Sequence, residues 1–427
     1  MGIYYIDPVD GSDSNDGLHA STPKRDINYI DAKPGDSVLF KRGSFIRAGI
    51  DNCSGQPGKP IVYGAYGEGA NPIFCGSLDL SSPDDWAYEK DDIWLCTKPV
   101  TAEVCNIVFN NGEHCGSLKW EKSELSAQGD WHDLCFCCQD KADKPQHIYL
   151  KSQDNPGIHY SHIECVTLAR KIAAGVGHDI IYENLSFENW MFAIAGSEGG
   201  RNITVRNCTF RFIGGGVWRP GRKIRYGNAV EFWDVCENVT VEKCIFEDIY
   251  DSGVTHQGGK NCKPPVNLHV DNNLFIKCGM GAYEGRDRVP INSSFNNNIC
   301  VNAGCGFSKN GATMPRCSEI WPQPMGHHVF LWRMEQGTEK GKMQIKGNVF
   351  CHAPYGAPIY SIISEEAESQ FEIANNSYCA GDYLLARRGG VEYTSFESYC
   401  QMEGGCKFED IDIERLVDDW KKQNGYT

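Results

Sequence analysis

A short motif recurs through the middle of the chain and constrains the fold more than any other feature. In each copy, alternating apolar residues lead to an Asn, two further residues follow, and an aromatic residue ends the motif. The first copies are Ile181–Phe187, Val205–Phe210 and Val241–Phe246, and in the third Lys243 takes the Asn place. Later copies end at Phe275, Cys300, Phe350 and Tyr378.

The spacing of these copies indicates a solenoid. They end 23, 36, 29, 25, 50 and 28 residues apart, which fits one coil per copy with insertions of variable length. The 50-residue step is then expected to contain a further coil or a long loop. Alternation predicts short strands, and the recurring Asn and Phe predict ladders of stacked side chains from coil to coil. Because one coil cannot bury its own apolar face, only stacked copies are stable.

We therefore predict an all-β fold, a right-handed parallel β-helix with side loops, over a single domain. Its parts are N-terminal coils at 1–110, central catalytic coils at 164–380 and a C-terminal cap at 394–427. In the cap, Ile413, Leu416, Val417 and Trp420 have helical spacing, which predicts a capping helix over the open end. A β-sandwich or propeller is the competing fold, but the short hairpin turns that it needs are scarce.

The net charge and the N-terminal sequence limit which binding partners and which cellular compartment are expected. With 41 basic and 56 acidic residues the net charge is −15, which disfavours nucleic acid and anionic membranes and suits neutral sugars better. Met1–Asp7 lacks the features of a signal peptide, and no apolar run is long enough to span a bilayer. We expect a cytoplasmic protein, although an export signal removed beforehand would leave the same sequence.

The 21 cysteines form no regular framework, and those in strand-like runs, such as Cys208 and Cys244, are expected to be reduced, buried and small. Cys135, Cys137 and Cys138 lack the paired spacing of a zinc ribbon. The acidic run Asp7, Asp10, Asp13 and Asp16 lacks the ligand order of a calcium loop, so turn capping is the preferred interpretation. No metal or other cofactor is expected.

Several segments resemble known β-helix enzymes. The N-terminal segments that look like the first coils of bacterial pectate-lyase-like β-helix enzymes are Tyr4–Pro8, Asp10–Asp13, Ala32–Val38 and Gly64–Gly69. Gly227–Trp233 followed by Tyr250–Thr255 is similar to the middle coils of β-helix glycoside hydrolases of the xylosidase, fucosidase and lacto-N-biosidase type. The resemblance implies a β-helix fold for nearly the whole chain. It also implies a glycosidase activity, and that part of the resemblance rests on about two coils.

Aligning the strand after each motif predicts which side chains share a face. The inward column would hold Ile194, Val230, Val254, Ala282 and Phe307. Because side chains alternate along a strand, the next residues would face solvent, namely Ala195, Glu231, Thr255, Tyr283 and Ser308. Beyond them lie His256, Glu284 and Lys309, and Asp251 opens its own row. This alignment gathers Glu231, Asp251, His256 and Glu284 over three consecutive coils.

Clustered carboxyls are what glycoside hydrolysis requires. One carboxyl protonates the leaving group, and the other acts as nucleophile at a separation of about 5 to 5.5 Å or as base at about 6.5 to 9.5 Å. We expect Asp251 and Glu284 to be the catalytic pair, with Glu231 in support. The reserve candidates are Asp234, Asp287 and Glu198, for which turn roles are the alternative.

Further residues suit sugar binding. Aromatic rings stack on sugar C–H surfaces and Arg donates paired hydrogen bonds, so Trp218 with Arg219 and Trp332 with Arg333 are candidate binding residues. The alternative to sugar binding is that each Trp packs against its own loop and stabilises it. The remaining candidates are His256, Tyr283 and Lys309, of which His256 is otherwise a hydrogen-bonded structural residue.

The leading functional hypothesis is a glycoside hydrolase that acts on plant- or mucin-type oligosaccharides. The first alternative is a polysaccharide lyase or uronate epimerase, which needs a basic groove. The basic stretch available for one comprises Arg219, Arg222, Lys223 and Arg225. The second alternative is a non-catalytic carbohydrate-binding solenoid.

Overall fold

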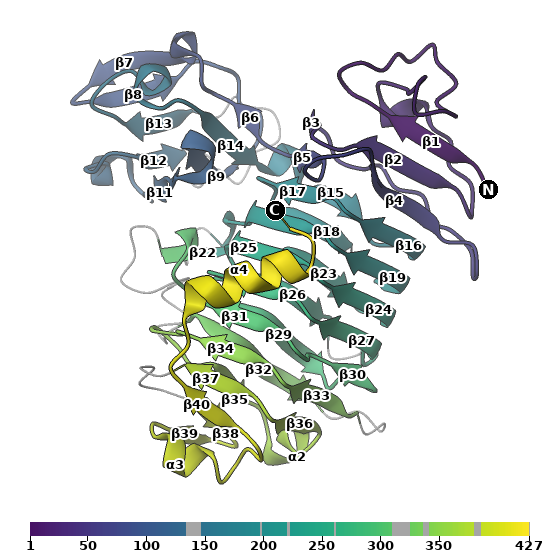
Figure 1. The fold of residues 1–427 in the computed structure, drawn as a ribbon. Coiled ribbons are helices and arrows are strands. Elements are labelled where there is room, and N and C mark those ends of the chain that lie inside the picture. Colours follow the sequence, from purple (N-terminus) through teal and green to yellow (C-terminus); the bar gives the residue numbers. More distant parts are fainter. Residues whose placement is uncertain are drawn as a thin grey trace.

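The protein is a parallel β-helix, seen in a computed structural model that describes residues 1–133, 147–196, 199–219, 223–259, 262–309, 325–335, 341–379 and 386–426. Its coils stack three long parallel sheets, here called walls A, B and C (Figure 1). This confirms the predicted fold class.

The strands of each wall lie in the following order. Wall A contains β1 (Ile3–Ile6), β2 (Ser37–Lys41), β4 (Ile61–Tyr66), β16 (His178–Glu183), β19 (Gly200–Arg206), β24 (Cys236–Glu242), β27 (Val266–Asp271), β30 (Ser293–Ser294), β33 (Met343–Lys346) and β36 (Phe371–Ala374). Wall B contains β3 (Phe45–Ile46), β5 (Ile73–Cys75), β17 (Ser186–Glu188), β20 (Thr209–Ile213), β25 (Ile245–Ile249), β28 (Leu274–Ile276), β31 (Ile299–Val301), β34 (Val349–Cys351), β37 (Ser377–Cys379) and β40 (Lys407–Glu409). Wall C contains β15 (Ile172–Gly175), β18 (Phe192–Gly196), β23 (Val230–Trp233), β26 (Ser252–Gln257), β29 (Gly281–Arg288), β32 (His327–Glu335), β35 (Ile359–Ile362), β38 (Ala386–Arg388) and, antiparallel at its end, β39 (Val391–Tyr393).

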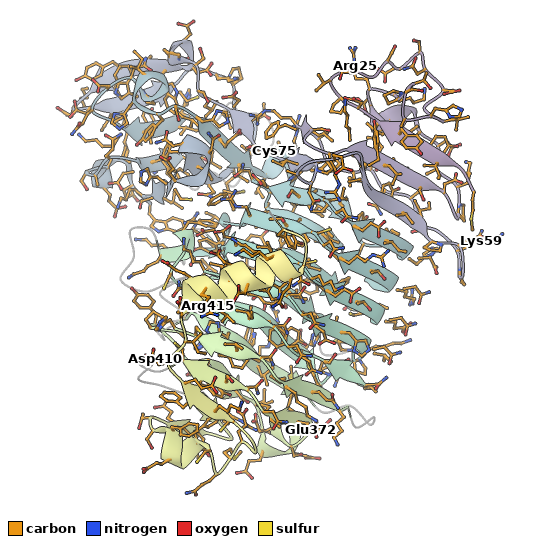
Figure 2. The ribbon with its side chains drawn as sticks, in the orientation of Figure 1. Arg25, Lys59, Cys75, Glu372, Asp410 and Arg415 are labelled. Carbon is orange, nitrogen blue, oxygen red and sulfur yellow. The ribbon has the colours of Figure 1, made fainter. Side chains whose placement is uncertain are left out.

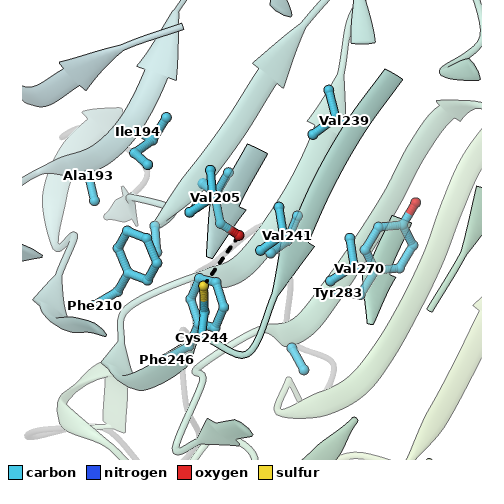
Figure 3. Close-up of a cluster of buried hydrophobic side chains, with 14 of the residues drawn as sticks. Ala193, Ile194, Val205, Phe210, Val239, Val241, Cys244, Phe246, Val270 and Tyr283 are labelled. Atoms are coloured by element: carbon cyan, nitrogen blue, oxygen red, sulfur yellow. Dashed lines mark hydrogen bonds between the residues drawn. The ribbon is translucent and has the colours of Figure 1, made fainter. Parts of the chain in front are cut away.

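The interior of the solenoid is a continuous apolar core in which aromatic side chains stack. Phe74, Phe187, Phe210, Phe246 and Phe275 form an unbroken run of stacked rings with centroids 4.6 to 5.7 Å apart. Figure 3 shows two of these rings beside the inward valines of wall A. The predicted Phe ladder is therefore confirmed, and its rows fix the register of successive coils.

The predicted Asn ladder exists, but one residue further along the chain. The motif Asn residues, such as Asn184 and Asn207, adopt positive φ at the corner between walls A and B. The residue after the motif position points inward, and from the fourth copy onward it is Asn. The stacked amides are those of Asn273, Asn298, Asn348 and Asn376, joined by hydrogen bonds of 2.9 to 3.2 Å. The same position in the preceding coils holds buried Cys208 and Cys244, as expected for small apolar cysteines.

A second amide ladder, not predicted, runs along the outside of wall A. Its members are Asn202, Asn238, Asn267 and Asn292, all with positive φ and linked by hydrogen bonds of 2.6 to 2.9 Å. Asn tolerates the left-handed region better than other non-glycine residues, which explains its place both at the corner between walls A and B and in this ladder.

A lobe of mostly antiparallel strands interrupts the early coils, between β5 and β15. This inserted lobe (residues 78–167) projects from the solenoid in Figure 1 and holds two sheets of its own. Its elements are β6 (Leu78–Asp79), β7 (Trp86–Lys90), β8 (Ile93–Cys96), β9 (Val104–Phe109), β10 (His114–Cys115), β11 (Ser117–Leu118), β12 (Asp130–Asp133), β13 (Ile148–Lys151), α1 (Pro156–His159) and β14 (Ile163–Thr167). The N-terminal coils thus give way to the lobe after Cys75, well before the expected boundary at residue 110.

A partly buried ion pair ties the inserted lobe to the solenoid. Arg47, after β3, forms two 2.7 Å hydrogen bonds with the carboxylate of Glu164 on β14. Ser77 and His162 each bond the same carboxylate at 2.6 Å. A bidentate Arg–carboxylate contact fixes direction as well as distance, so this cluster orients the lobe.

The C-terminal helix α4 (Ile413–Gln423) forms as predicted, but it does not close the end of the solenoid. It lies along wall B in Figure 1, and its apolar face covers an apolar stripe on the outside of that wall. Buried Trp420 packs with Ile245, Leu274 and Ile299, while Arg415 faces solvent (Figure 2). The stripe explains the placement, because outward apolar residues on wall B must themselves be covered. The short helices α2 (Glu365–Glu368) and α3 (Phe396–Tyr399) lie at the last coils.

Asp7 and Asp16 of the acidic N-terminal run cap turns, as interpreted from the sequence. Asp7 accepts hydrogen bonds from the backbone of Val9 and Asp10, and Asp16 accepts one from that of Leu18. Asp13 instead joins distant backbone, that of Arg25 and Asp26, and Asp10 pairs with Lys41. Over the described parts of the chain, no helix has the length and apolarity needed to cross a membrane.

Candidate active site

The outward face of wall C holds the predicted acids, with one shift in register. The strand pairs align Ala195, Glu231, Thr255 and Glu284 in one row. Tyr283 was predicted for that row, but it pairs with Val254 and lies fully buried in the core, where Figure 3 shows it. The one-residue shift exchanges the two faces of β29, so Glu284 rather than Tyr283 faces outward.

The last coil of the predicted alignment is also wrong. Phe307 and Ser308 were expected to continue the column and the row, but they lie in a short 3-10 helix at Phe307–Lys309. The next strand of wall C is β32, in which Val329 and Phe330 take the two positions. The 50-residue step in the motif therefore contains one coil with long insertions, and Trp332 and Arg333 belong to a wall strand rather than to a loop.

Glu231 is buried and its carboxylate is fully engaged. Oε2 accepts a 2.6 Å hydrogen bond from Asn228, and Oε1 accepts the indole N–H of Trp233. The pKa of Glu231 is raised from 4.5 to about 7. Burial is the largest cause, the hydrogen bonds from Asn228 and Trp233 lower the pKa, and the charges of Glu284 and Asp251 raise it. A carboxyl with this pKa carries a proton through much of the neutral range.

Glu284 lies two coils from Glu231 in the same row. Its Oε1 accepts a 2.6 Å hydrogen bond from the indole of Trp332, and its Oε2 accepts one of 3.1 Å from Thr255, the residue between the two acids. With a strand spacing of about 4.8 Å, the backbones at Glu231 and Glu284 are about 9.6 Å apart. Each acid thus has its own tryptophan donor.

Asp251 lies at the turn before β26, next to this row. Its backbone N–H donates to Gly227 at 3.1 Å, and its carbonyl accepts from Met280 at 2.8 Å. Its charge acts on Glu231, as the pKa of that residue shows. The exposed fractions are 5% for Glu231, 3% for Asp251 and 1% for Glu284, so these acids share a desolvated region rather than a solvated surface.

A second outward row lies beside the acids. The strand pairs align Trp233 with Gln257 and Arg286 with Trp332, and a hydrogen bond joins Gln257 to Arg286. The Arg286 guanidinium lies 6.0 Å from the ring centroid of Trp233 and 5.0 Å from that of Trp332. Arg286 also donates to Gln257 at 2.6 Å and forms an ion pair of 3.4 Å with Asp287.

Arg333 lies at the far edge of this row. Its guanidinium is 5.5 Å from the ring of Trp332 and 3.8 Å from the carboxylate of Asp287. The reserve candidate Asp287 therefore serves two arginines. Trp332 thus lies against Glu284 and Arg333 against Trp332. Arg286 and Trp233 were not predicted.

His256, predicted to bind substrate, points into the solenoid instead. Its ring nitrogens bond the hydroxyl of Tyr283 and the carbonyl of Arg288, each at 3.0 Å. Burial lowers the pKa of His256 to about 4, so it is neutral at physiological pH. The alternative interpretation, a hydrogen-bonded structural histidine, is the one that this placement favours.

Two other predicted residues lie away from the acid row. Lys309 bonds the hydroxyl of Tyr355 from the 3-10 helix. Trp218 is half-exposed on the hairpin of β21 (Gly216–Arg219) and β22 (Ile224–Tyr226). The side chain of Arg219, together with Glu198, Arg222 and Cys135 to Cys138, lies outside the described residues.

The hairpin and the inserted lobe cover one side of the acids. Val217 donates to Glu103 of the lobe at 2.6 Å, and Tyr226 packs with Phe192 of wall C. Burial raises the pKa of Tyr226 to about 12, with smaller contributions from nearby groups that include Glu231. Tyr226 is therefore a neighbour of Glu231 that sequence reasoning missed, since nothing in the hairpin sequence marks it.

The described residues contain no group of three or more His, Cys, Asp or Glu side chains arranged to hold a metal ion. What the acid row and its tryptophans offer is a proton donor, a second carboxylate and hydrogen-bonding side chains in a desolvated setting. These are the groups that general acid–base catalysis requires.

Comparison with solved structures supports the architecture. XylC in complex with xylose superposes with a TM-score of 0.56 at 12% identity, over 88% of this chain and 62% of that one. The chain therefore shares the fold of XylC. It spans less than two thirds of the XylC chain, so the likeness concerns fold alone.

Two further structures are similar at lower scores. One, named a glycoside hydrolase, has a TM-score of 0.47 at 10% identity over 98% of both chains. The other is the GH136 lacto-N-biosidase from Eubacterium ramulus, with a TM-score of 0.44 at 15% identity over 96% of this chain and 67% of that one. No protein-family model and no curated protein sequence matches the chain.

Proposed function

We propose that the protein is a glycoside hydrolase in which Glu231 is the proton donor and Glu284 the second catalytic carboxylate. The observation that carries the proposal is the shared row on wall C, where both acids are buried and each accepts an indole N–H. Sequence reasoning paired Asp251 with Glu284. The register favours Glu231 instead, because it faces the same way as Glu284.

The spacing of the two acids favours inversion. Their backbones are about 9.6 Å apart, which is close to the inverting range of about 6.5 to 9.5 Å and well above the retaining separation of about 5 to 5.5 Å. Glu231 would then protonate the glycosidic oxygen while Glu284 removes a proton from the attacking water. Asp251 supports the acid, since its negative charge helps to keep Glu231 protonated.

Burial supports the choice of the acid. A general acid works best when its pKa lies near the working pH, and desolvation brings Glu231 to about 7. The same burial favours short substrates, because a long polysaccharide needs an open groove along the wall. We therefore propose plant- or mucin-type oligosaccharides, and xylosides come first in a test because the similar XylC structure contains xylose.

The test uses aryl xylosides, fucosides and galactosides with good and poor leaving groups. Glu231→Gln should lose at least about 100-fold in kcat/KM on poor leaving groups and much less on dinitrophenyl glycosides, which need no protonation. Glu284→Gln should lose activity on both, and NMR should show the inverted anomer first. Full activity in either variant would remove that residue from the mechanism, and full activity in Asp251→Asn would limit Asp251 to a structural role.

A polysaccharide lyase is the alternative outcome. The basic stretch that would serve it is partly committed to structure, because Arg225 donates to the carbonyls of Gly215 and Cys105 at 2.8 Å. Incubation with pectin or alginate distinguishes the two reactions, since a lyase releases an unsaturated product that absorbs ultraviolet light. Binding of glycans without turnover would favour the non-catalytic solenoid.

A further inference from the structure

The two candidate acids are connected through a single arginine. Glu231 and Glu284 sit in one row of wall C, and their donors Trp233 and Trp332 sit in the next. Arg286 lies between these tryptophans and contacts both rings, at 6.0 and 5.0 Å from the centroids.

We propose that Arg286 is a positioning residue that holds both indoles and thereby fixes the two carboxyl groups relative to each other. A guanidinium over an aromatic face is attracted by the negative centre of the ring, and the attraction grows in a desolvated site. Arg286 can serve two rings at once because its charge is spread over a plane.

Arg286 is held by one hydrogen bond and one ion pair. Its Nη1 donates to Gln257 at 2.6 Å, and its Nε lies 3.4 Å from the Asp287 carboxylate, an ion-pair contact without a hydrogen bond. Gln257 pairs with Trp233 in the strand register, so the residue that bonds Arg286 also lies beside Trp233. These contacts hold the guanidinium beside both rings, which is what a positioning role requires.

The consequence for the acids follows from hydrogen bonding. An indole N–H in a fixed direction restrains the carboxylate that accepts it, and a carboxyl misplaced by 1 Å can cost about 100-fold in rate. Arg286 therefore acts through the tryptophans and not on the reacting bond. The catalytic part of this inference rests on the proposed function, whereas the contacts themselves do not.

The first experiment needs no substrate. Protein labelled with ¹⁵N-tryptophan gives one indole signal per Trp, and Trp233→Phe and Trp332→Phe assign the two signals of interest. Because Trp233 donates to Glu231, its signal should titrate with a midpoint near pH 7. The other ionisable groups around Glu231 are Asp251, Glu284 and Tyr226.

Arg286→Gln should shift both indole signals and move the Trp233 midpoint above pH 7, because loss of the Trp233 bond raises the pKa of Glu231. Arg333→Gln is the matched comparison, since Arg333 also pairs with Asp287 but lies over the ring of Trp332 alone of the two tryptophans, at 5.5 Å, and should shift that signal alone. Arg387→Gln controls for the loss of an arginine from wall C. Arg387 contacts the ring of Tyr360, and Tyr360 lies two coils beyond Glu284.

Kinetics then test the positioning role. Arg286→Gln should lower kcat about 10- to 100-fold with KM within about twofold, and Arg286→Lys should recover part of the loss by restoring the charge. A selective rise in KM would overturn the proposal in favour of substrate binding. Unchanged indole signals in both Arg286 variants would overturn it regardless of activity. If the wild type cleaves no glycoside, the proposed function fails while the indole signals still decide the contact.

Discussion

The buried Glu231 carboxyl should make the stability of the protein depend on pH in a defined direction. Its pKa is about 7 in the folded protein and about 4.5 in the unfolded chain. A group whose pKa is raised on folding contributes stability below its unfolded pKa, and this contribution is lost as pH rises through the folded value. The side chain of the Glu231→Gln variant cannot ionise. As pH rises, the wild type should therefore lose unfolding free energy from this group, whereas the variant should not.

The size of the effect follows from the two pKa values. A pKa of 4.5 in the unfolded chain and about 7 in the folded protein corresponds to a total loss of about 3.4 kcal/mol in the free energy of unfolding as pH rises. About 2.5 kcal/mol of this loss falls between pH 5 and pH 8. The substitution also has a cost that does not depend on pH. The new amide cannot accept from both Asn228 and Trp233, and one unsatisfied donor costs about 1 to 3 kcal/mol.

Urea denaturation followed by tryptophan fluorescence at pH 5, 6, 7 and 8 measures the effect. The free energy of unfolding of Glu231→Gln minus that of the wild type should rise by about 2.5 kcal/mol across this range. Glu237→Gln, on the solvent side of wall A, controls for the loss of one negative charge. Parallel curves for wild type and Glu231→Gln would refute the conclusion that this carboxyl is desolvated and protonated near neutrality.

Three further predictions concern the solenoid and the site. Asn298→Ala should reduce stability by about 2 to 4 kcal/mol in the same urea assay, because it breaks the buried ladder on both sides, whereas Asn267→Ala in the exposed ladder should cost less than about 1 kcal/mol. Trp420→Ala should cost about 3 kcal/mol and release α4 from wall B, visible as faster amide exchange on β28 and β31. Hydrolysis should fall as pH rises above about 7, where Glu231 loses its proton, and Trp233→Phe should move this limb to higher pH because it removes a bond that lowers the pKa.

The repeating parts of the fold were predictable because they follow from period and packing. Alternation with a stacked Phe in every coil allows few other solutions, so the walls and the aromatic ladder emerged from sequence alone. The amide ladder was misplaced by one residue because two requirements attract Asn. The corner needs positive φ and the adjacent inward position needs a stacking amide, and the pair Asn272–Asn273 satisfies both.

The error on wall C has a similar local cause. In β29, Ala282 and Tyr283 are both apolar, so alternation cannot tell which of them points inward. The length of the turn before the strand decides this, and turn length is not encoded in hydrophobic period. The shift moved Tyr283 into the core and Glu284 into the acid row.

The inserted lobe was missed because its hairpins carry weak turn signals. The turn between β7 and β8 has Asp91 and Asp92, both with positive φ, where Asn-Gly would have marked a hairpin. Arg286 was missed for a different reason. Its role depends on two tryptophans from separate coils, and such a contact becomes visible only once the register is known.

A crystal structure soaked with the product sugar would show whether Glu231 and Glu284 act on one glycosidic bond. We expect a monosaccharide at wall C with its anomeric carbon between the carboxyls of Glu231 and Glu284. Sugar bound only elsewhere, for example on the inserted lobe, with these two carboxyls still covered, would contradict it.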